Sequence, residues 1–343
     1  MVVKLPRLIP IILLALLTVG GVRIIQPNHS QSIGIKPLQL DPAHHGQRRL
    51  GELIFLSAWE LDSPNEDFGG ISGLAALPDD RFIGISDAGT LIGFGLTNDD
   101  RIDRPFIAPL PGSVQPGGNY RDRDSEGITF DAESGQFWIS YEAKHAIRRF
   151  SRSFARLDGV IRPKEMQLWP RNKGAETLIR MKDGRFIIIS ESLEDDDTHQ
   201  ALLFSGDPVE PGSVKTSFRY RPPAGYRATD GTQLPDGRIM LLHRSVGLPT
   251  GFSAKLGIAL PPDLAKNINW DSRIIASLSA PLLVDNMEGI AVKQAGNDTI
   301  IWLISDSNFN ILQRTILMKF RLAERGGNKK PEAVAAPGFE SLN

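Results

Sequence analysis

A short pattern of residues recurs five times along the chain and restricts the fold more than any other feature. Each copy has a small or acidic residue, usually followed by glycine, then an apolar run, a turn, a second apolar run and a polar cluster. The copies begin at Ser72, Glu126, Glu176, Asp230 and Glu288, so the steps are 54, 50, 54 and 58 residues. A period of this length accommodates one small antiparallel sheet per repeat, which predicts a β-propeller.

The two apolar runs of each copy predict a β-hairpin. In the clearest copy, residues 178–181 and 186–189 flank a turn that contains Asp183 and Gly184, and this dipeptide supplies the positive φ angles of a tight turn. Residues 53–56 form a strand-like run before the first copy, and we expect this run to close the ring by pairing with the last blade. Helical periodicity is nearly absent. The predicted fold class is therefore all-β, a propeller of five or six blades, with a sixth blade drawn from residues 51–71 and either 91–120 or the segment after 320.

The remaining sequence divides the chain into four predicted parts. Residues 1–25 place Lys4 and Arg7 before an apolar run, which predicts a signal peptide or an uncleaved membrane anchor, and hence a periplasmic or secreted protein. Residues 26–49 are polar and proline-containing and predict a linker. Residues 50–322 hold the propeller, and residues 323–343 predict a disordered tail.

Composition narrows the possible partners and cofactors. The formal net charge is −1, which argues against a nucleic-acid partner, because such a protein normally carries an excess of basic residues. The chain has no cysteine, which excludes disulfides and thiolate metal sites. We expect a monomer that contacts a membrane only through the N-terminal segment.

The first position of the repeat is acidic in four copies and predicts a metal site. Equivalent residues of stacked blades converge on one axis, where carboxylates repel one another unless a cation neutralises them. A hard cation such as Ca²⁺ prefers several oxygen ligands. The predicted ligands are Glu126, Glu176, Asp230 and Glu288, with Asp124 and Asn286 as neighbouring contributors. Two alternatives stay open, a ring of arginine–carboxylate ion pairs and plain solvated loops.

The end of the second strand of each copy predicts a second polar layer. Its members are Asp87, Glu142, Glu191, the pair His243 and Arg244, and Asp306. Arginine recognises phosphate or carboxylate by paired hydrogen bonds. The predicted catalytic residues are Glu142, His243, Arg244 and Asp306, with Glu142 or His243 as the base. The predicted substrate-binding residues are Arg123, Arg244, Asp87 and Glu191. A structural role for His243 stays open.

Several of these segments resemble one known family. Residues 70–74, 85–87, 124–128, 138–142, 172–176 and 286–290 are similar to the "esterase-like activity of phytase" family, and the likeness extends over residues 53–320. The resemblance implies a propeller fold, an exported protein and hydrolysis of a phosphoester or carboxylester. Asp230 stands where the family pattern has a glutamate, which weakens the case for this residue as a ligand.

Taken together, these patterns favour a metal-dependent hydrolase of a small anionic ester, plausibly a phosphoester. One alternative is a lactonase-type propeller in which Ca²⁺ polarises a carbonyl group. Another is a non-catalytic propeller that binds a protein or a glycan and holds a structural ion. A serine hydrolase is disfavoured, because Gly69 to Gly73 lacks the strand–turn–helix context of a nucleophile elbow.

Overall fold

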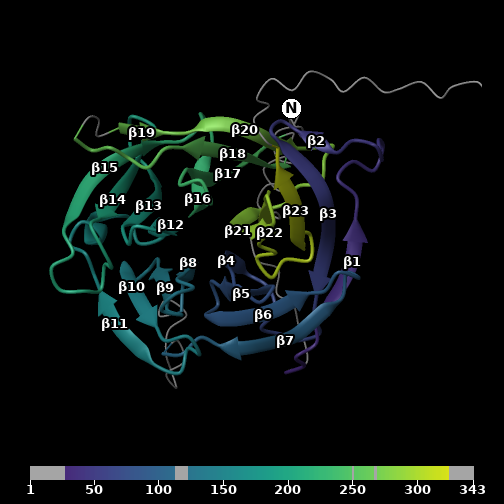
Figure 1. The fold of residues 1–343 in the computed structure, drawn as a ribbon, viewed down its shortest axis with the longest axis horizontal. Coiled ribbons are helices and arrows are strands. Elements are labelled where there is room, and N and C mark those ends of the chain that lie inside the picture. The colour runs from purple at the N-terminus through teal and green to yellow at the C-terminus, as the bar shows by residue number, and fades with distance from the viewer. Residues whose placement is uncertain (1–27, 113–122, 249–250, 266–268, 324–343) are drawn as a thin grey trace, which may run out of the picture.

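The computed structural model describes residues 28–112, 123–248, 251–265 and 269–323, which form five sheets around one axis, antiparallel except for one strand pair in the third (Figure 1). Each sheet is one blade of a propeller. The innermost strands are β4, β8, β12, β16 and β21, and each contacts the next around a closed ring. The all-β prediction is confirmed and the number of blades is five. Among the described residues the only helix is a 3₁₀ turn, Met166–Leu168.

The strands of each blade follow one another outward from the axis. Blade 1 contains β4 (Ile71–Ala76), β5 (Arg81–Ser86), β6 (Thr90–Leu96) and β7 (Ile102–Pro109). Blade 2 contains β8 (Ser125–Phe130), β9 (Phe137–Tyr141), β10 (Ala146–Phe150) and β11 (Leu157–Ile161). Blade 3 contains β12 (Ala175–Arg180), β13 (Phe186–Leu193), β14 (His199–Phe204), β15 (Lys215–Arg221) and β19 (Asn269–Asp271). Blade 4 contains β16 (Arg227–Gln233), β17 (Ile239–Gly247), β18 (Gly251–Ala259) and β20 (Arg273–Ser279).

Blade 5 joins the two ends of the described chain. It contains β21 (Met287–Ala295), β22 (Asp298–Ser305) and β23 (Thr315–Leu322), and then β3 (Leu53–Asp62) and β1 (Gly34–Leu38), with β2 (Arg49–Leu50) beside β3. β3 pairs with β23 from Leu53↔Leu322 to Leu61↔Thr315, so the expected closing strand is confirmed. Part of the range predicted as a linker instead forms β1 and β2. No sixth blade forms from residues 51–71 and 91–109, because the former supply β3 and the latter complete blade 1.

The apolar core lies between the blades. Five clusters of buried side chains each combine the facing surfaces of two neighbouring blades. Between blades 5 and 1, for example, Trp302 packs edge-on against Phe82, with 4.8 Å between ring centroids. A strand in the middle of a blade is covered on both faces, so β9 and most of β13 are buried throughout. This explains why the sequence shows continuous apolar runs where a half-exposed sheet would alternate.

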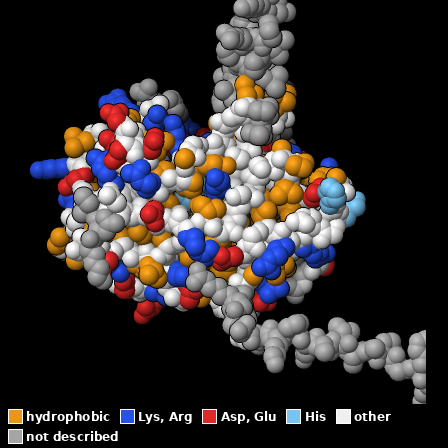
Figure 2. All heavy atoms as spheres, turned by 90° about the horizontal axis from the view of Figure 1, so that it is seen from above, with side chains coloured by type: hydrophobic (Ala, Val, Ile, Leu, Met, Phe, Trp, Pro, Cys, Tyr) orange, Lys and Arg blue, Asp and Glu red, His pale blue; other side chains and the backbone are white. Residues whose placement is uncertain are grey.

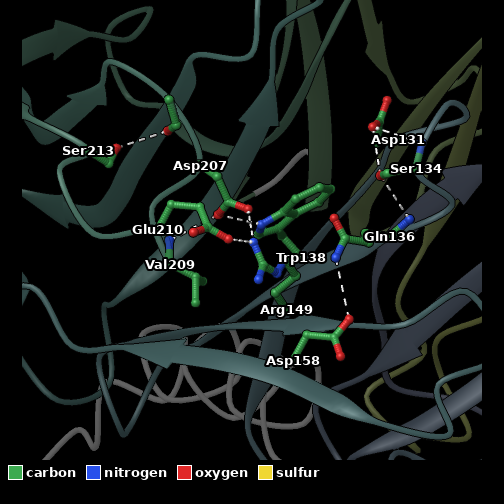
Figure 3. Close-up of polar contacts among 11 residues, drawn as sticks. Asp131, Ser134, Gln136, Trp138, Arg149, Asp158, Asp207, Val209, Glu210 and Ser213 are labelled. Atoms are coloured by element: carbon green, nitrogen blue, oxygen red, sulfur yellow. Dashed lines mark hydrogen bonds and ion pairs between the residues drawn. The ribbon is translucent and has the colours of Figure 1, made fainter.

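A partly exposed ion-pair group also joins blades 2 and 3 (Figure 3). Arg149, from β10, lies between Asp207 and Glu210, which follow β14, with 2.5 Å from Nη1 to an oxygen of each. Asp207 also accepts a hydrogen bond from Trp138 Nε1 at 2.8 Å. The side chains of Arg149 and Asp207 are only 14% and 17% exposed, so this ion pair lies in a partly desolvated environment.

The molecular surface in Figure 2 carries basic and acidic side chains interspersed. This distribution agrees with the near-zero net charge of the chain. Within the described residues, no helix has the length and apolar character that a membrane crossing requires. The predicted signal or anchor segment, residues 1–25, and residues 324–343 of the predicted tail lie outside the part that the structure describes.

Candidate functional site at the mouth of the propeller

A β-bulge near the start of each inner strand builds one mouth of the central channel. The register against the second strand shifts after Ile71, Ser125, Ala175, Ala228 and Met287. The residues that follow these five positions are Ser72, Glu126, Glu176, Thr229 and Glu288. A bulge leaves its extra residue outside the hydrogen-bonded ladder and changes the direction of its side chain. The first position of the repeat, which is acidic in most copies, therefore coincides with a β-bulge in the inner strand.

Carboxylates of blades 2 and 3 converge at this mouth. Asp124, Glu126 and Glu142 each have a carboxylate oxygen within 4.8 Å of the others, and so do Glu142, Glu176 and Glu191. Glu142 belongs to both groups and accepts a hydrogen bond from the backbone N–H of Gly174 at 3.1 Å. In the part of the chain that the structure describes, no basic side chain forms an ion pair with Glu126, Glu142 or Glu176. The predicted ligands Glu126 and Glu176 thus lie in an acidic half of the mouth.

Two arginines of blade 4 neutralise the other half. Arg244 Nη1 lies 3.2 Å from Glu288 Oε1 and donates to Asn286 Oδ1 at 2.8 Å, while Nη2 lies 3.3 Å from Glu191 Oε1. Arg227 Nη1 lies 3.3 Å from the same Glu191 oxygen. Glu288 and Asn286 therefore both contact an arginine, although the charge of Glu288 still helps to raise the pKa of Glu176 in the acidic half.

Burial is the main cause of strongly raised pKa values in this mouth. It raises the pKa of Glu142 to about 8, with a further contribution from the negative charge of Asp124. Burial and the charges of Glu176 and Glu142 raise the pKa of Glu126 well above its ordinary value. The pKa of Glu288 rises only to about 7, because Arg244 opposes the effect of burial. Several of these groups consequently hold protons at neutral pH unless a cation replaces them.

Asp87 and Asp306 form a third acidic group, a pair on the side of blades 1 and 5. Burial raises the pKa of Asp87 to about 6, and it raises the pKa of Asp306 well above normal, with Asp87 as the next cause. Asp306 accepts a hydrogen bond from the backbone N–H of Asn308 at 2.6 Å. Both predicted site residues therefore reach the mouth. Arg123 precedes Asp124, and its buried Nε has no hydrogen-bond partner among the described residues.

Asp230 occupies a different position from the other three predicted ligands. In blade 4 the bulge follows Ala228, so Thr229 is the equivalent of Glu126, Glu176 and Glu288. Asp230 pairs with Leu242 and is directed at blade 5, where it accepts a hydrogen bond from the backbone N–H of Ile290 at 2.8 Å. It also accepts one from Gly231 N–H at 2.7 Å. Asp230 therefore belongs to neither carboxylate triad, although the charge of Glu288 contributes to its raised pKa. The position equivalent to the glutamates lies one residue earlier in this copy, at Thr229.

The structure also separates His243 from Arg244. Neighbouring residues of a strand point to opposite faces, and Arg244 takes the side that faces the mouth. His243 is buried between blades 3 and 4, with Nε2 2.5 Å from Tyr220 Oη and Nδ1 3.1 Å from the carbonyl oxygen of Lys255. Burial lowers the pKa of His243 to about 3. His243 therefore fits the structural role that the sequence analysis left open. Its buried ring does not reach the mouth, where a catalytic base would have to act.

Arg227 is a mouth residue that the sequence analysis missed. It occupies the position of blade 4 that Asp124 and Asn286 occupy in blades 2 and 5, opposite the end of the second strand. Arg227 lies two residues before Thr229, as Asp124 lies before Glu126 and Asn286 before Glu288. A match of acidic residues hides this equivalence, because it equates Asp230 instead of Thr229 with the glutamates.

The fold and the acidic mouth define a five-bladed β-propeller with a polar site at one end of its channel. The family model described as "Phytase-like: Esterase-like activity of phytase" matches residues 66–309. The chain belongs to this family. The search of curated proteins found no match.

Solved structures with a similar fold have very different sequences. The PQQ domain of a pyranose dehydrogenase from Coprinopsis cinerea is 10% identical, with 87% of this chain and 98% of that chain covered and a TM-score of 0.41. The major allergen Mala s 1 of Malassezia sympodialis is 11% identical, with 80% and 91% covered and a TM-score of 0.43. Similarities of this size carry no inference about function.

Proposed function

We propose that the mouth binds a divalent cation, Ca²⁺ in the first instance, and hydrolyses a small anionic ester, with a phosphoester as the favoured class. The observation that carries this proposal is the pair of carboxylate triads that share Glu142, with oxygens within 4.8 Å of one another. Oxygens on opposite sides of a Ca²⁺ ion lie about 5 Å apart, given Ca–O distances of about 2.3–2.6 Å. The triads contain only oxygen donors, which suits a hard cation, and among the described residues no basic side chain forms an ion pair with Glu126, Glu142 or Glu176.

The cation, the arginines and Glu142 would then have separate roles in the reaction. The cation would hold and polarise the ester oxygens. Arg244 and Arg227 of blade 4 contact Glu191 of the second triad and would attract the anionic group of the substrate. Glu142 belongs to both triads, and without a cation burial raises its pKa to about 8. A bound cation would favour the carboxylate form of Glu142, in which it could accept a proton as a general base.

Export is part of the same proposal. The basic residues and apolar run at the N-terminus support a protein that acts in the periplasm or outside the cell, released or held by an anchor. Millimolar Ca²⁺ outside the cytoplasm would suit a site of moderate affinity.

Calorimetric titration with Ca²⁺ tests the cation site. We expect Glu126→Gln and Glu142→Gln to weaken binding by about tenfold or more, since each removes one charged ligand. Glu133→Gln is the matched control, because this glutamate is exposed in the turn between β8 and β9, at the other end of the same blade. Absence of binding to the unmodified protein, or equal binding by all variants, would remove the cation from the proposal.

A substrate panel then tests catalysis with the same variants. It contains p-nitrophenyl phosphate, p-nitrophenyl acetate, phytate and a lactone, each with Ca²⁺ and with EDTA. We expect Ca²⁺-dependent turnover of a phosphoester that Glu142→Gln loses and Glu133→Gln keeps. Turnover of the lactone alone would favour the lactonase alternative. A protein that binds Ca²⁺ but turns over nothing in the panel would be a binding propeller with a structural ion.

A further inference from the structure

Large apolar side chains that stay exposed gather at the mouth end of the propeller. Nine such residues are exposed in the described part of the chain, and five of them lie in connections at this end. These five form the apolar rim: Leu168, Val246, Leu248, Ile311 and Leu312. The segments that carry them lead into blade 3 and belong to blades 4 and 5, which are consecutive around the ring (Figure 1). Single exposed apolar residues are normal on a protein surface, whereas a group on one side marks an interaction site.

Two parts of the apolar rim are placed by their neighbours in the chain. Leu168 lies in the connection from β11 to β12, and the residues on either side of it line a cavity together with the mouth residue Glu142. The hairpin of β17 and β18 continues for three residue pairs past Arg244. At about 3.3 Å per residue, the hairpin extends about 10 Å beyond the level of this mouth residue. Val246 and Leu248 are therefore held out from the mouth.

The third part is the loop between β22 and β23, which begins at the mouth residue Asp306. It carries Ile311 and Leu312, which are 81% and 57% exposed. The loop is ordered by its own hydrogen bonds. The backbone N–H of Asn310 donates to the carbonyl oxygen of Ser307 at 2.7 Å, and its side-chain oxygen accepts from the N–H of Leu312 at 3.0 Å. The loop therefore presents two large apolar side chains to the outside in a fixed arrangement.

The described chain also begins at the mouth end. The carbonyl oxygen of Asn28 accepts a hydrogen bond from the N–H of Glu66 at 3.2 Å, and that of Ser30 accepts one from Asn65 Nδ2 at 2.8 Å. Residues 63–70 connect the end of β3 with the start of the inner strand β4, which lies at the mouth. The polypeptide therefore enters the propeller on the same side as the apolar rim.

The length of the chain before Asn28 limits how far this end can lie from a membrane. The apolar run of the predicted anchor reaches Ile25, so only residues 26 and 27 separate it from Asn28. Three steps of about 3.8 Å between consecutive Cα atoms span about 11 Å at most. If residues 1–25 are retained as an anchor, the mouth end is held within about this distance of the bilayer surface. A gap of this width equals the diameter of one helix, about 10–12 Å, and leaves no room for a folded partner domain.

We propose that the apolar rim docks on the lipid bilayer that holds the N-terminal anchor, so that the mouth end faces the lipid surface. This docking rests on the anchored form of the proposed function. Leucine, isoleucine and valine side chains gain free energy when they leave water for the boundary between headgroups and acyl chains. Stable attachment commonly combines two membrane contacts, and here the rim adds a second contact to the N-terminal segment.

Fluorescence quenching by lipids tests the docking, and the absence of native cysteine makes single labelling sites available. Leu168→Cys, Leu248→Cys and Leu312→Cys carry an environment-sensitive dye on the rim. Val214→Cys and Leu260→Cys are the matched controls, because these apolar residues are 66% and 74% exposed in connections at the opposite end. The full-length proteins are reconstituted in EDTA into vesicles of phosphatidylcholine and phosphatidylglycerol, with and without a quencher at the boundary between headgroups and acyl chains. We expect quenching of the rim dyes to exceed that of the control dyes by about twofold or more.

A pair of charged variants tests whether the rim itself makes the contact. With the dye at position 248, Ile311→Asp/Leu312→Asp should lower the quenching by about half, because carboxylates resist transfer out of water. Val214→Asp/Leu260→Asp should leave the quenching unchanged. Equal effects of the two double variants would overturn the docking.

The outcomes separate this proposal from the preceding one. The intact mass of the protein isolated from membranes shows whether residues 1–25 are retained. If they are retained and the rim dyes are quenched no more than the control dyes, the docking alone is refuted. Removal of these residues from the mature protein would refute both the anchor and the docking. Neither result changes the Ca²⁺ titration or the substrate panel, which report on the carboxylate triads.

Discussion

Arg244 lies between two glutamates that would otherwise repel each other across the mouth. It contacts Glu191 of blade 3 and Glu288 of blade 5, and its side chain is 22% exposed. Arg227 contacts the same Glu191 oxygen but is 38% exposed. The two arginines thus allow a comparison of a more buried and a more exposed partner for one carboxylate.

Replacing Arg244 by glutamine should lower the free energy of unfolding by about 3 kcal/mol, because it leaves partly buried charges without their cation. Arg227→Gln should cost less than about 1 kcal/mol, as solvent screens the more exposed pair. Urea unfolding in EDTA at pH 8 measures both values. Equal losses in the two variants would show that Arg244 has no special role. The double variant Arg244→Gln/Glu288→Gln should regain part of the lost stability.

The sequence could predict which residue types reach the mouth but not where each side chain points. Glu126, Glu142, Glu176 and Glu191 are placed together as the repeat indicated. Asp230 and His243 are not, because a bulge and the alternation of a strand decide which neighbour faces the axis. Moving the bulge or the strand register by one residue turns each side chain to the opposite face. The composition of a segment shows neither the position of a bulge nor the register.

At the scale of strands, the glycine after the bulge lets neighbouring inner strands approach closely. A β-carbon on Gly127 would lie 2.7 Å from the carbonyl oxygen of Glu176 and 2.9 Å from the β-carbon of Leu178. Gly73 shows the same crowding, with 2.8 Å to the carbonyl oxygen of Glu126. The repeated Glu-Gly pair therefore has two functions, since the glutamate faces the mouth and the glycine allows the blades to pack.

Gly127→Ala should lower the free energy of unfolding by about 2 kcal/mol, because backbone and core atoms of blade 3 must move. Gly206→Ala is the control. A β-carbon there meets no atom within 4 Å, so stability should stay within about 0.5 kcal/mol of the unmodified protein. Chemical denaturation compares the two. A Gly127→Ala protein as stable as the control would mean that the inner strands can separate without cost.

Local strand signals in the sequence were sufficient for the hairpins but not for the pairing of distant segments. The hairpins of β4–β5 and β12–β13 follow from turn residues and apolar runs. β1 was missed because Gly34–Leu38 is short, largely exposed and interrupted by a proline, and it forms only on the edge of β3. β19 was also missed. It pairs in parallel with β15 of blade 3, although the strands before and after it belong to blade 4.

At the scale of the whole molecule, the acidic mouth links stability to pH and to Ca²⁺. Burial raises the pKa of Glu142 to about 8, and those of Glu126 and Asp306 rise well above normal. A carboxyl group with a raised pKa in the folded state contributes stability at low pH, and that contribution is lost as the pH rises through the folded pKa. The lowered pKa of His243 reduces the free energy of unfolding only below about pH 6.5, the pKa of histidine in the unfolded chain.

In EDTA, the free energy of unfolding should therefore fall between pH 7 and pH 9. Glu142 alone accounts for about 1 kcal/mol of this loss. Saturating Ca²⁺ should reduce the loss, because the cation binds the deprotonated form. Glu142→Gln cannot titrate and should show a smaller dependence on pH. Urea unfolding at both pH values measures the effect, and constant or rising stability in EDTA would contradict it.

The seam between β3 and β23 has a consequence for how the chain becomes a folded protein. During synthesis β3 emerges early, and β23 is the last of the described strands to emerge. The edge of β3 that pairs with β23, which includes the apolar residues 53–56, therefore stays unpaired until the described chain is nearly complete. Such edges favour aggregation. Nascent chains truncated before Thr315 should therefore depend on chaperones, and a pull on the two ends of the finished propeller should open this seam first.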